Sequence, residues 1–364
     1  MGKHMKEEYT SLTSIYKCGF RRLTRKNIIR ACIYSFISVL FFYLLLNKRR
    51  PIMRLEEECL DFINESVDEC LKFNTRPEQN KCFSEIQTTL PLQPIKMTQL
   101  TAVFLYTGEK IPVVIKRVIV KKEVALNEDK ISMQLKNKYI IRHIKTRKKY
   151  FVNHNGVEQE ITFLFSEYLS TKITQRNVSR NEDKIRAILK DALKGLDYMH
   201  QKKIAHLDLK IANIMGNLEN GKIIYKLIDF GYSRVLPKKE IYIEGKSYGT
   251  YPYKPPEVIF DHIHGLKSDI WCMGAIAWFL SLGRTPFYTE EGEKAPDKYK
   301  KFLLGKIKHV FNTNTSAELQ DFILKAMNRN KDDRPTVTEL LKHPFLTKQM
   351  EYNYSTNDYL DSSS

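Results

Sequence analysis

The chain has 364 residues, of which 42% are hydrophobic and 28% are charged. This composition can bury one large or two medium cores, and it excludes a fibrous or wholly disordered protein. The formal net charge of +18 is uneven, because residues 1–54 contain twelve Lys and Arg against two Glu. The basic run at 142–149 has no interleaved aromatic residues and no groove-reading motif, so we expect no nucleic acid among the partners.

Residues 31–46 form the only strongly apolar run, and cations flank it at Arg30 and at 48–50. As a helix the run would reach about 24 Å, short of the roughly 30 Å hydrocarbon core, but flanking cations can snorkel and lipid can thin. The sequence therefore predicts a basic segment at 1–30 and a single-pass membrane anchor at 31–46. Two alternatives stay open. One is a buried core helix, and the other is a recessed signal sequence that would make the protein secreted or exported.

A juxtamembrane helical segment is predicted at 47–94. Its apolar residues recur at the spacing of one amphipathic helix: Leu55, Cys59, Phe62, Ile63, Val67, Cys70 and Leu71. None of the six cysteines forms a C-x-x-C pair, so a zinc site or a redox dithiol has no support.

Alternating apolar residues predict three β-strands, at 101–106, 111–116 and 161–166, with a turn at Gly108 between the first two. The second strand is predicted to end at Lys116. Glu128 then opens an acidic segment with helical spacing, and an apolar stripe at 185–199 predicts a core helix.

The loops after that helix contain the most informative residues. His206-Leu-Asp-Leu-Lys-Ile-Ala-Asn213 is followed sixteen residues later by Asp229-Phe-Gly231. In this arrangement Asp208 can accept a hydroxyl proton, and Lys210 and Asn213 lie near a transferring phosphate. Asp229 offers a second carboxylate to hold magnesium. The chemistry implied is phosphoryl transfer from ATP.

Further motifs follow in a fixed order: Tyr248-Gly-Thr-Tyr-Pro-Tyr-Lys-Pro-Pro-Glu257, Ser268-Asp-Ile-Trp-Cys-Met-Gly274, Leu282-Gly-Arg-Thr-Pro-Phe287 and Arg334-Pro335. With these the chain resembles the eukaryotic protein kinases over roughly residues 95–346. The resemblance implies an α+β, bilobal fold with a small strand-rich lobe near 95–168 and a larger helical lobe near 169–348. A polar, acidic tail at 349–364 is predicted to be disordered.

The resemblance also implies ATP and Mg²⁺ as cofactors. Asp208 would be the catalytic base, and Asn213 and Asp229 would be the metal ligands. Lys116, fixed by an ion pair with Glu128, would align the phosphates.

Five positions also match the family. Lys210 and Thr250 resemble the serine/threonine form of the catalytic machinery, in which threonine bridges the lysine and the catalytic aspartate. Glu167 and Leu169 resemble the hinge that reads adenine through backbone groups, and Ser166 before them falls at the gatekeeper position. A small hydroxyl there predicts an open rear pocket.

Two departures from the family stand out. No glycine occurs between Gly19 and Gly108, so Lys96, Thr98 and Thr101 occupy the positions of the phosphate-covering glycines. We expect their side chains to crowd the phosphates or lift the hairpin. Leu207 replaces the arginine before the catalytic aspartate, which predicts activity without phosphorylation of the activation segment.

The sequence thus predicts a serine/threonine protein kinase that transfers the ATP γ-phosphate to hydroxyls of protein substrates, anchored to a membrane. The alternative is a pseudokinase scaffold tethered to a membrane. The absent glycines favour the scaffold, whereas the intact lysine, asparagine and both aspartates favour the enzyme.

Overall fold

The computed structural model describes residues 92–98, 101–107, 112–119, 128–152, 158–174, 178, 181–237, 240–242, 246–284, 287 and 296–348. The predicted anchor at 31–46, the predicted helix around 55–71, the turn at Gly108 and the tail at 349–364 lie outside these residues. No helix in the described ranges is both long and apolar enough to cross a membrane. The site lies in a compact unit formed by Ile95–Leu105 and Pro112–Ser364.

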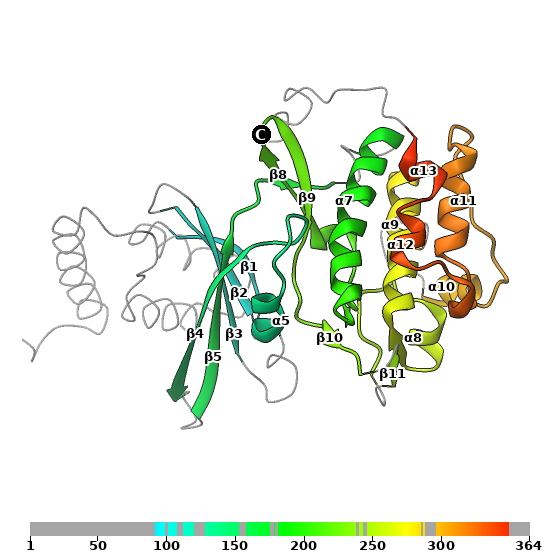
Figure 1. Cartoon of the computed structure of the whole chain (residues 1–364). Helices are drawn as coiled ribbons and strands as arrows, with labels where there is room; N and C mark the ends of the chain where they lie inside the picture. The colour runs from blue at the N-terminus through cyan, green and yellow to red at the C-terminus, as the bar shows by residue number, and fades with distance from the viewer. Residues whose placement is uncertain are drawn as a thin grey trace, which may run out of the picture. The chain divides into compact units, whose positions relative to one another are not determined.

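The first lobe is built on a five-stranded sheet in the order β1-β2-β3-β5-β4 (Figure 1). Its elements are β1 (Leu92–Met97), β2 (Thr101–Tyr106), β3 (Val113–Ile119), α5 (Glu128–Gln134), β4 (His143–Val152) and β5 (Glu158–Glu167). Strand β5 pairs antiparallel with both β3 and β4. Helix α5 packs on β4, where Lys148 and Asp129 form an ion pair of 3.1 Å.

The register of β3 decides where Lys116 points. Lys116 lies opposite Leu164, and Val118 lies opposite Thr162, which is also opposite Lys148. Because alternate residues share a face, Lys116 and Lys148 lie on the same side of the sheet, the side covered by α5. The predicted end of the strand at Lys116 is wrong, since pairing with β5 continues to Ile119.

The second lobe is helical and surrounds α9 (Leu266–Leu282), which lies between α7 (Glu182–Gln201) and α11 (Ala317–Ala326) (Figure 1). Smaller helices complete the lobe: α8 (Pro256–Phe260), α10 (Pro296–Leu303), α12 (Val337–Leu340), α13 (Pro344–Thr347) and the 3-10 turns η1 (Ile211–Asn213) and η2 (Lys331–Asp333). Helix α9 is buried along almost its whole length, which its apolar sequence requires.

Helix α7 confirms the predicted core stripe, since the residues that form it are fully buried: Ile185, Ile188, Leu189, Ala192, Leu193, Leu196 and Met199. The helix starts at a cap in which the Asn181 side chain accepts a hydrogen bond from the Lys184 amide. Glu182 and Asp183 follow in its first turn, where the helix dipole favours carboxylates.

Short strands flank the loops that carry the sequence motifs. They are β6 (Thr171–Lys172), β7 (Ile204–Ala205), β8 (Ile214–Glu219), β9 (Lys222–Leu227), β10 (Arg234–Val235), β11 (Glu240–Tyr242) and β12 (Ile263–Gly265). Asp208 follows β7, Asn213 precedes β8, and Asp229 follows β9, so three strand ends supply the predicted chemistry. A strand-rich lobe followed by a helical lobe confirms the predicted fold class.

An aromatic cluster of the helical lobe holds a histidine with an unusual ionisation. The ring of His309 lies 4.6 Å from that of Trp278 and 4.8 Å from that of Phe302, and its Nε2 has no hydrogen-bond partner among the residues that the structure describes. Burial, assisted by the nearby charge of Arg329, lowers the pKa of His309 to about 4. The imidazole is therefore neutral in the folded protein at pH 7.

We expect His309 to make stability depend on pH. Because the unfolded chain binds the proton near pH 6.5, whereas the folded one binds it near 4, the free energy of unfolding falls as pH drops from 6.5 to 4. The loss should be about 2–3 kcal/mol. Urea unfolding at several pH values checks this, with His309→Phe as the comparison. A difference between the two proteins that does not change with pH would contradict it.

Candidate active site

A buried carboxylate on α9 anchors the loop that carries Asp208. Asp269 on α9 accepts hydrogen bonds from the amides of His206 (2.8 Å) and Leu207 (2.9 Å), and the His200 ring lies 2.9 Å away. Leu207 has a positive φ of 63°, which turns the chain sharply just before Asp208. Sequence reasoning included Asp269 in a motif but missed this anchoring contact, because it joins segments more than sixty residues apart.

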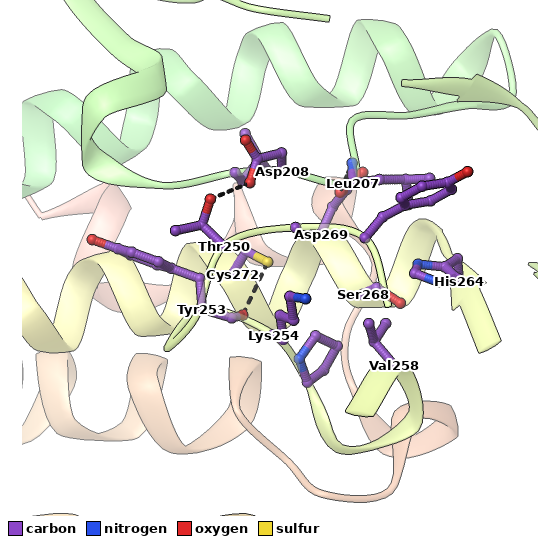
Figure 2. A pocket seen from close by; sticks show the side chains of 14 residues that line it. Leu207, Asp208, Thr250, Tyr253, Lys254, Val258, His264, Ser268, Asp269 and Cys272 are labelled. Atoms are coloured by element: carbon purple, nitrogen blue, oxygen red, sulfur yellow. Dashed lines mark hydrogen bonds between the residues drawn. The ribbon is translucent and has the colours of Figure 1, made fainter. Parts of the chain in front are cut away.

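Asp208, Lys210 and Thr250 form a closed triangle of contacts. The Lys210 Nζ lies 2.7 Å from Asp208 Oδ2 and 2.8 Å from Thr250 Oγ1. The Thr250 hydroxyl donates to Asp208 Oδ1 at 2.7 Å, as Figure 2 shows. The structure thus brings Thr250 into contact with two side chains that precede it by forty residues or more. Asp208 is 4% exposed, and the contacts hold both its carboxylate oxygens in place.

Asn213 joins this triangle to the Asp229 loop. Its Nδ2 donates to the backbone oxygen of Asp208 at 2.8 Å and lies 3.3 Å from Asp208 Oδ2. Its backbone oxygen accepts from the amide of Ile228 at 3.0 Å, directly before Asp229. Asp229 itself has a positive φ of 65°, so both acidic loops carry a non-glycine residue in a strained backbone region.

Lys116 connects the sheet to the same loops. Its Nζ lies 2.6 Å from Glu128 Oε1 and 2.8 Å from Asp229 Oδ1. Burial opposes the charge on this ammonium, but Glu128 and Asp229 outweigh burial and raise the pKa of Lys116. Burial likewise opposes ionisation of Asp229, but the charge of Lys116 lowers its pKa to about 2. Burial raises the pKa of Glu128, against the opposing effect of Lys116.

The oxygen donors at this junction fit a magnesium ion. The Asn213 amide uses its nitrogen toward Asp208, which leaves its Oδ1 for a cation, and Asp229 supplies a carboxylate. In the described ranges, no group of three or more His, Cys, Asp or Glu could hold a metal. Mg²⁺ suits such a sparse set, because it binds through one or two protein oxygens together with substrate phosphates and water.

The predicted hinge residues lie at the end of β5. Ser166 pairs with Val114, two residues before Lys116, so both side chains belong to the same sheet face. The Glu167 carboxylate binds Lys226 Nζ at 3.0 Å and the Arg142 amide at 2.7 Å. That side chain is therefore structural, and the backbone amide of Glu167 is also engaged, since it donates to the Arg142 carbonyl at 3.1 Å. Leu169 is 2% exposed.

We expect Ser166→Phe to weaken inhibition by an adenine analogue that carries a bulky substituent. A large ring at position 166 would fill the space behind the nucleotide, and overpacking of this kind costs about 10–100-fold in affinity. The half-maximal inhibitory concentration of the analogue, measured for both proteins at matched ATP saturation, checks this. Equal inhibition of the two would contradict the placement of Ser166.

The hairpin between β1 and β2 has a threonine clasp instead of glycines. The Thr98 amide donates to the Thr101 carbonyl at 2.8 Å, and the Thr101 amide donates to Thr98 Oγ1 at 3.1 Å. Lys96 and Thr98 are exposed. The Thr98 side chain is therefore turned onto its own hairpin, and it satisfies an amide that a glycine-rich loop would offer to phosphate.

Comparisons with known proteins agree with this geometry. The family described as protein kinase domain matches residues 105–346. Sperm motility kinase 2B of Mus musculus is 36% identical over 169 residues, 46% of this chain and 33% of that protein. The protein named "Probable serine/threonine-protein kinase mkcD" of Dictyostelium discoideum is 36% identical over 196 residues, 51% of this chain and 28% of that protein.

A third relative, the serine/threonine-protein kinase PLK4 of Nematostella vectensis, is 29% identical over 240 residues, 65% of this chain and 23% of that protein. The chain thus spans a third or less of the length of these relatives. The family match, by contrast, covers about two-thirds of this chain, from the second strand of the sheet to the last helix. The chain belongs to the protein kinase domain family.

Proposed function

We propose that the protein is a serine/threonine protein kinase that transfers the γ-phosphate of ATP to protein hydroxyls. The observation that carries the proposal is the simultaneous formation of the Asp208–Lys210–Thr250 triangle and the Lys116–Glu128–Asp229 ion cluster. Each requires residues from distant segments of the chain. A domain that had lost catalytic activity would not need to retain both sets of contacts. The names of two relatives, as serine/threonine-protein kinases, support the acceptor class.

The Asp208 carboxylate orients the acceptor hydroxyl and takes its proton as the new bond to phosphorus forms. Lys210, held beside Asp208, places a positive charge next to the transferring group and stabilises the charge that develops on its oxygens. Thr250 lies in the activation segment, between Asp229 and Glu257, and its hydroxyl holds both side chains in place. The rate gain comes mainly from position and electrostatics.

Lys116 holds the phosphates in line from the opposite side, and its ion pair with Glu128 makes its position depend on helix α5. Asn213 and Asp229 would hold the metal. When bound, Mg²⁺ neutralises the phosphate oxygens and screens them from the incoming hydroxyl.

The proposal is tested with the full chain, Mg²⁺, labelled ATP and a generic basic protein as acceptor. Asp229→Asn should lose nearly all incorporation, because it removes the carboxylate for the metal and weakens the hold on Lys116. Asp332→Asn is the matched control, since that side chain is 77% exposed and follows Asp229 by more than a hundred residues in the sequence. Equal incorporation by the wild type and Asp229→Asn would reject the kinase function.

A tethered pseudokinase is the second candidate, and the threonine clasp favours it, because the clasp removes a phosphate-binding amide. The same assay separates the two. A scaffold would bind its partners without transferring label in any variant, including the wild type.

The proposal includes a membrane anchor at residues 31–46, supported by the apolar run and its flanking cations. Carbonate extraction of membranes that contain the full chain tests it. Release of the chain by carbonate would show that it is not an integral membrane protein. Protease protection in sealed vesicles would then report whether it was exported.

We expect the activity to survive phosphatase treatment. Leu207, where the family commonly has arginine, packs in an apolar cluster with Ala205 and Leu236, against which Ile241 and Leu266 also pack. The activation segment is further held by the β10–β7 and β11–β12 pairs. These contacts need no phosphate.

Treatment of the purified enzyme with a broad phosphatase should change kcat less than about twofold. Mass spectrometry verifies that phosphate has been removed. A large loss of rate after treatment would show that a phosphorylated residue holds the segment instead.

A further inference from the structure

Lys254 is a half-buried cation beside the catalytic triangle that the proposed mechanism does not use. It follows Thr250 by four residues, and its Nζ donates to the backbone oxygen of Ser247 and lies 3.2 Å from Ser247 Oγ. In the described part of the chain, no carboxylate lies within ion-pair distance of this ammonium. A cation in such a place has neutral partners only.

The position of Lys254 relates it to the acceptor site. Lys254 lines the same small cavity as Asp208, Gly249 and Thr250 (Figure 2). A Cβ built on Gly249 would lie 3.6 Å from Lys254 Cγ, so the stem of the lysine packs along the loop that carries Thr250. An acceptor hydroxyl at Asp208 would therefore bring its neighbouring residues close to the Lys254 side chain.

The environment of Lys254 disfavours its positive charge. Burial lowers the pKa of Lys254, and only the charge of Asp208 opposes this effect. That carboxylate is already bound by Lys210 and Thr250. The ammonium thus lacks a counter-ion of its own, and a desolvated cation without one is costly unless a ligand supplies the charge.

The catalytic loop adds no competing acid. Between Lys210 and Asn213 it carries only Ile211, which is buried, and Ala212, which is exposed. Apart from Asp208, the described cavity lining on this side is either neutral or held in other contacts: Asp269 binds the catalytic-loop amides, and His264 lies by the Lys246 carbonyl. A basic substrate residue would meet Lys254 with no acid to receive it, whereas an acidic one would find an unpaired ammonium.

We propose that Lys254 selects protein substrates with a carboxylate side chain within two residues of the acceptor serine or threonine. The inference rests on the proposed kinase function and names its substrate class. The substrate carboxylate takes the place of Ser247 as the ligand of Lys254 or joins it. Lys254 acts on specificity only, since it does not touch the reacting atoms.

The test uses the full chain and short peptides with one serine acceptor, flanked by alanine except at one position within two residues on either side. That position carries Glu, Ala or Lys, and kcat/KM is measured for each peptide. At one position we expect the Glu peptide to exceed the Lys peptide about tenfold or more, the size of a close charge pair's discrimination. Lys254→Met, which keeps the apolar stem, should reduce that ratio to about twofold.

Two controls make the result decisive. Lys308→Met removes an exposed lysine and should retain the wild-type ratio, whereas Lys254→Glu should reverse it in favour of the Lys peptide. If thermal unfolding shows that Lys254→Met is not folded, Lys254→Gln provides the same ratio. Wild-type activity without a preference, or a preference that survives in the folded Lys254 variants, overturns the inference. Absence of transfer to every peptide and to the generic protein would instead reject the kinase function.

Discussion

Asp208→Asn is expected to lower kcat by about 10²–10⁴-fold, the usual contribution of a positioned general base. Asparagine keeps the shape of the side chain and can still accept a hydrogen bond from Lys210 or Thr250, but it cannot take a proton from the acceptor hydroxyl. The loss should therefore appear in the chemical step. Steady-state kinetics with saturating ATP and acceptor protein give kcat directly.

The KM for ATP separates this effect from a general collapse of the site. Asp208 contacts neither Lys116 nor Asp229 in the described hydrogen-bond network, so Asp208→Asn should leave that KM within about threefold. Asp332→Asn again serves as the control. An Asp208→Asn enzyme with more than a tenth of wild-type kcat would mean that Asp208 is not the base.

Arg334→Met is expected to have the largest effect on stability, about 3–5 kcal/mol. Arg334 is 1% exposed and forms two parallel bonds to Glu257, Nη1 to Oε1 and Nη2 to Oε2, each of 2.8 Å. The guanidinium also lies over the Trp271 ring, 5.1 Å from its centroid. Removal of the arginine leaves the Glu257 carboxylate buried with Ser268 as its remaining side-chain partner.

A loss of this size should lower the Tm by roughly 10 °C for a domain of this length, which differential scanning calorimetry can measure. Arg284→Met, at an exposed arginine, is the matched control and should change the Tm little. The double variant Glu257→Leu with Arg334→Met should recover part of the loss, because it removes the stranded charge. A single Arg334→Met protein as stable as the wild type would show that the pair contributes nothing net.

The candidate catalytic residues could be proposed from the sequence because the chemistry requires fixed residue types at short spacings. Asp208, Lys210 and Asn213 lie within six residues, and the structure places the side chains of Lys210 and Asn213 against that of Asp208. Contacts between distant segments were not predictable in this way. Asp269 and the loop at 206–207, or Glu167 and Lys226, meet only because the chain folds back on itself.

The basic run at 142–149 shows why a charge pattern alone can mislead. It is not among the strands predicted from the sequence, yet most of it forms strand β4 at the edge of the sheet. Lys148 pairs with Asp129 and Glu160, and the Lys145 ammonium lies over the Phe165 ring at 4.7 Å. The aliphatic parts of lysine side chains can pack on a sheet while their ammonium groups contact other residues. A polar segment of this kind can therefore form a strand.

The threonine clasp bears on how the enzyme would respond to its supply of nucleotide. A hairpin that satisfies its own amide at Thr101 gives up one donor to a bound triphosphate, and a hydrogen bond to a charged group contributes about 1.5–3 kcal/mol. Weaker binding of ATP raises the KM for ATP, and weaker binding of ADP speeds ADP release. The turnover rate would then rise with the ATP concentration over the cellular range instead of being saturated. The kinase activity would therefore depend on the ATP level of its compartment.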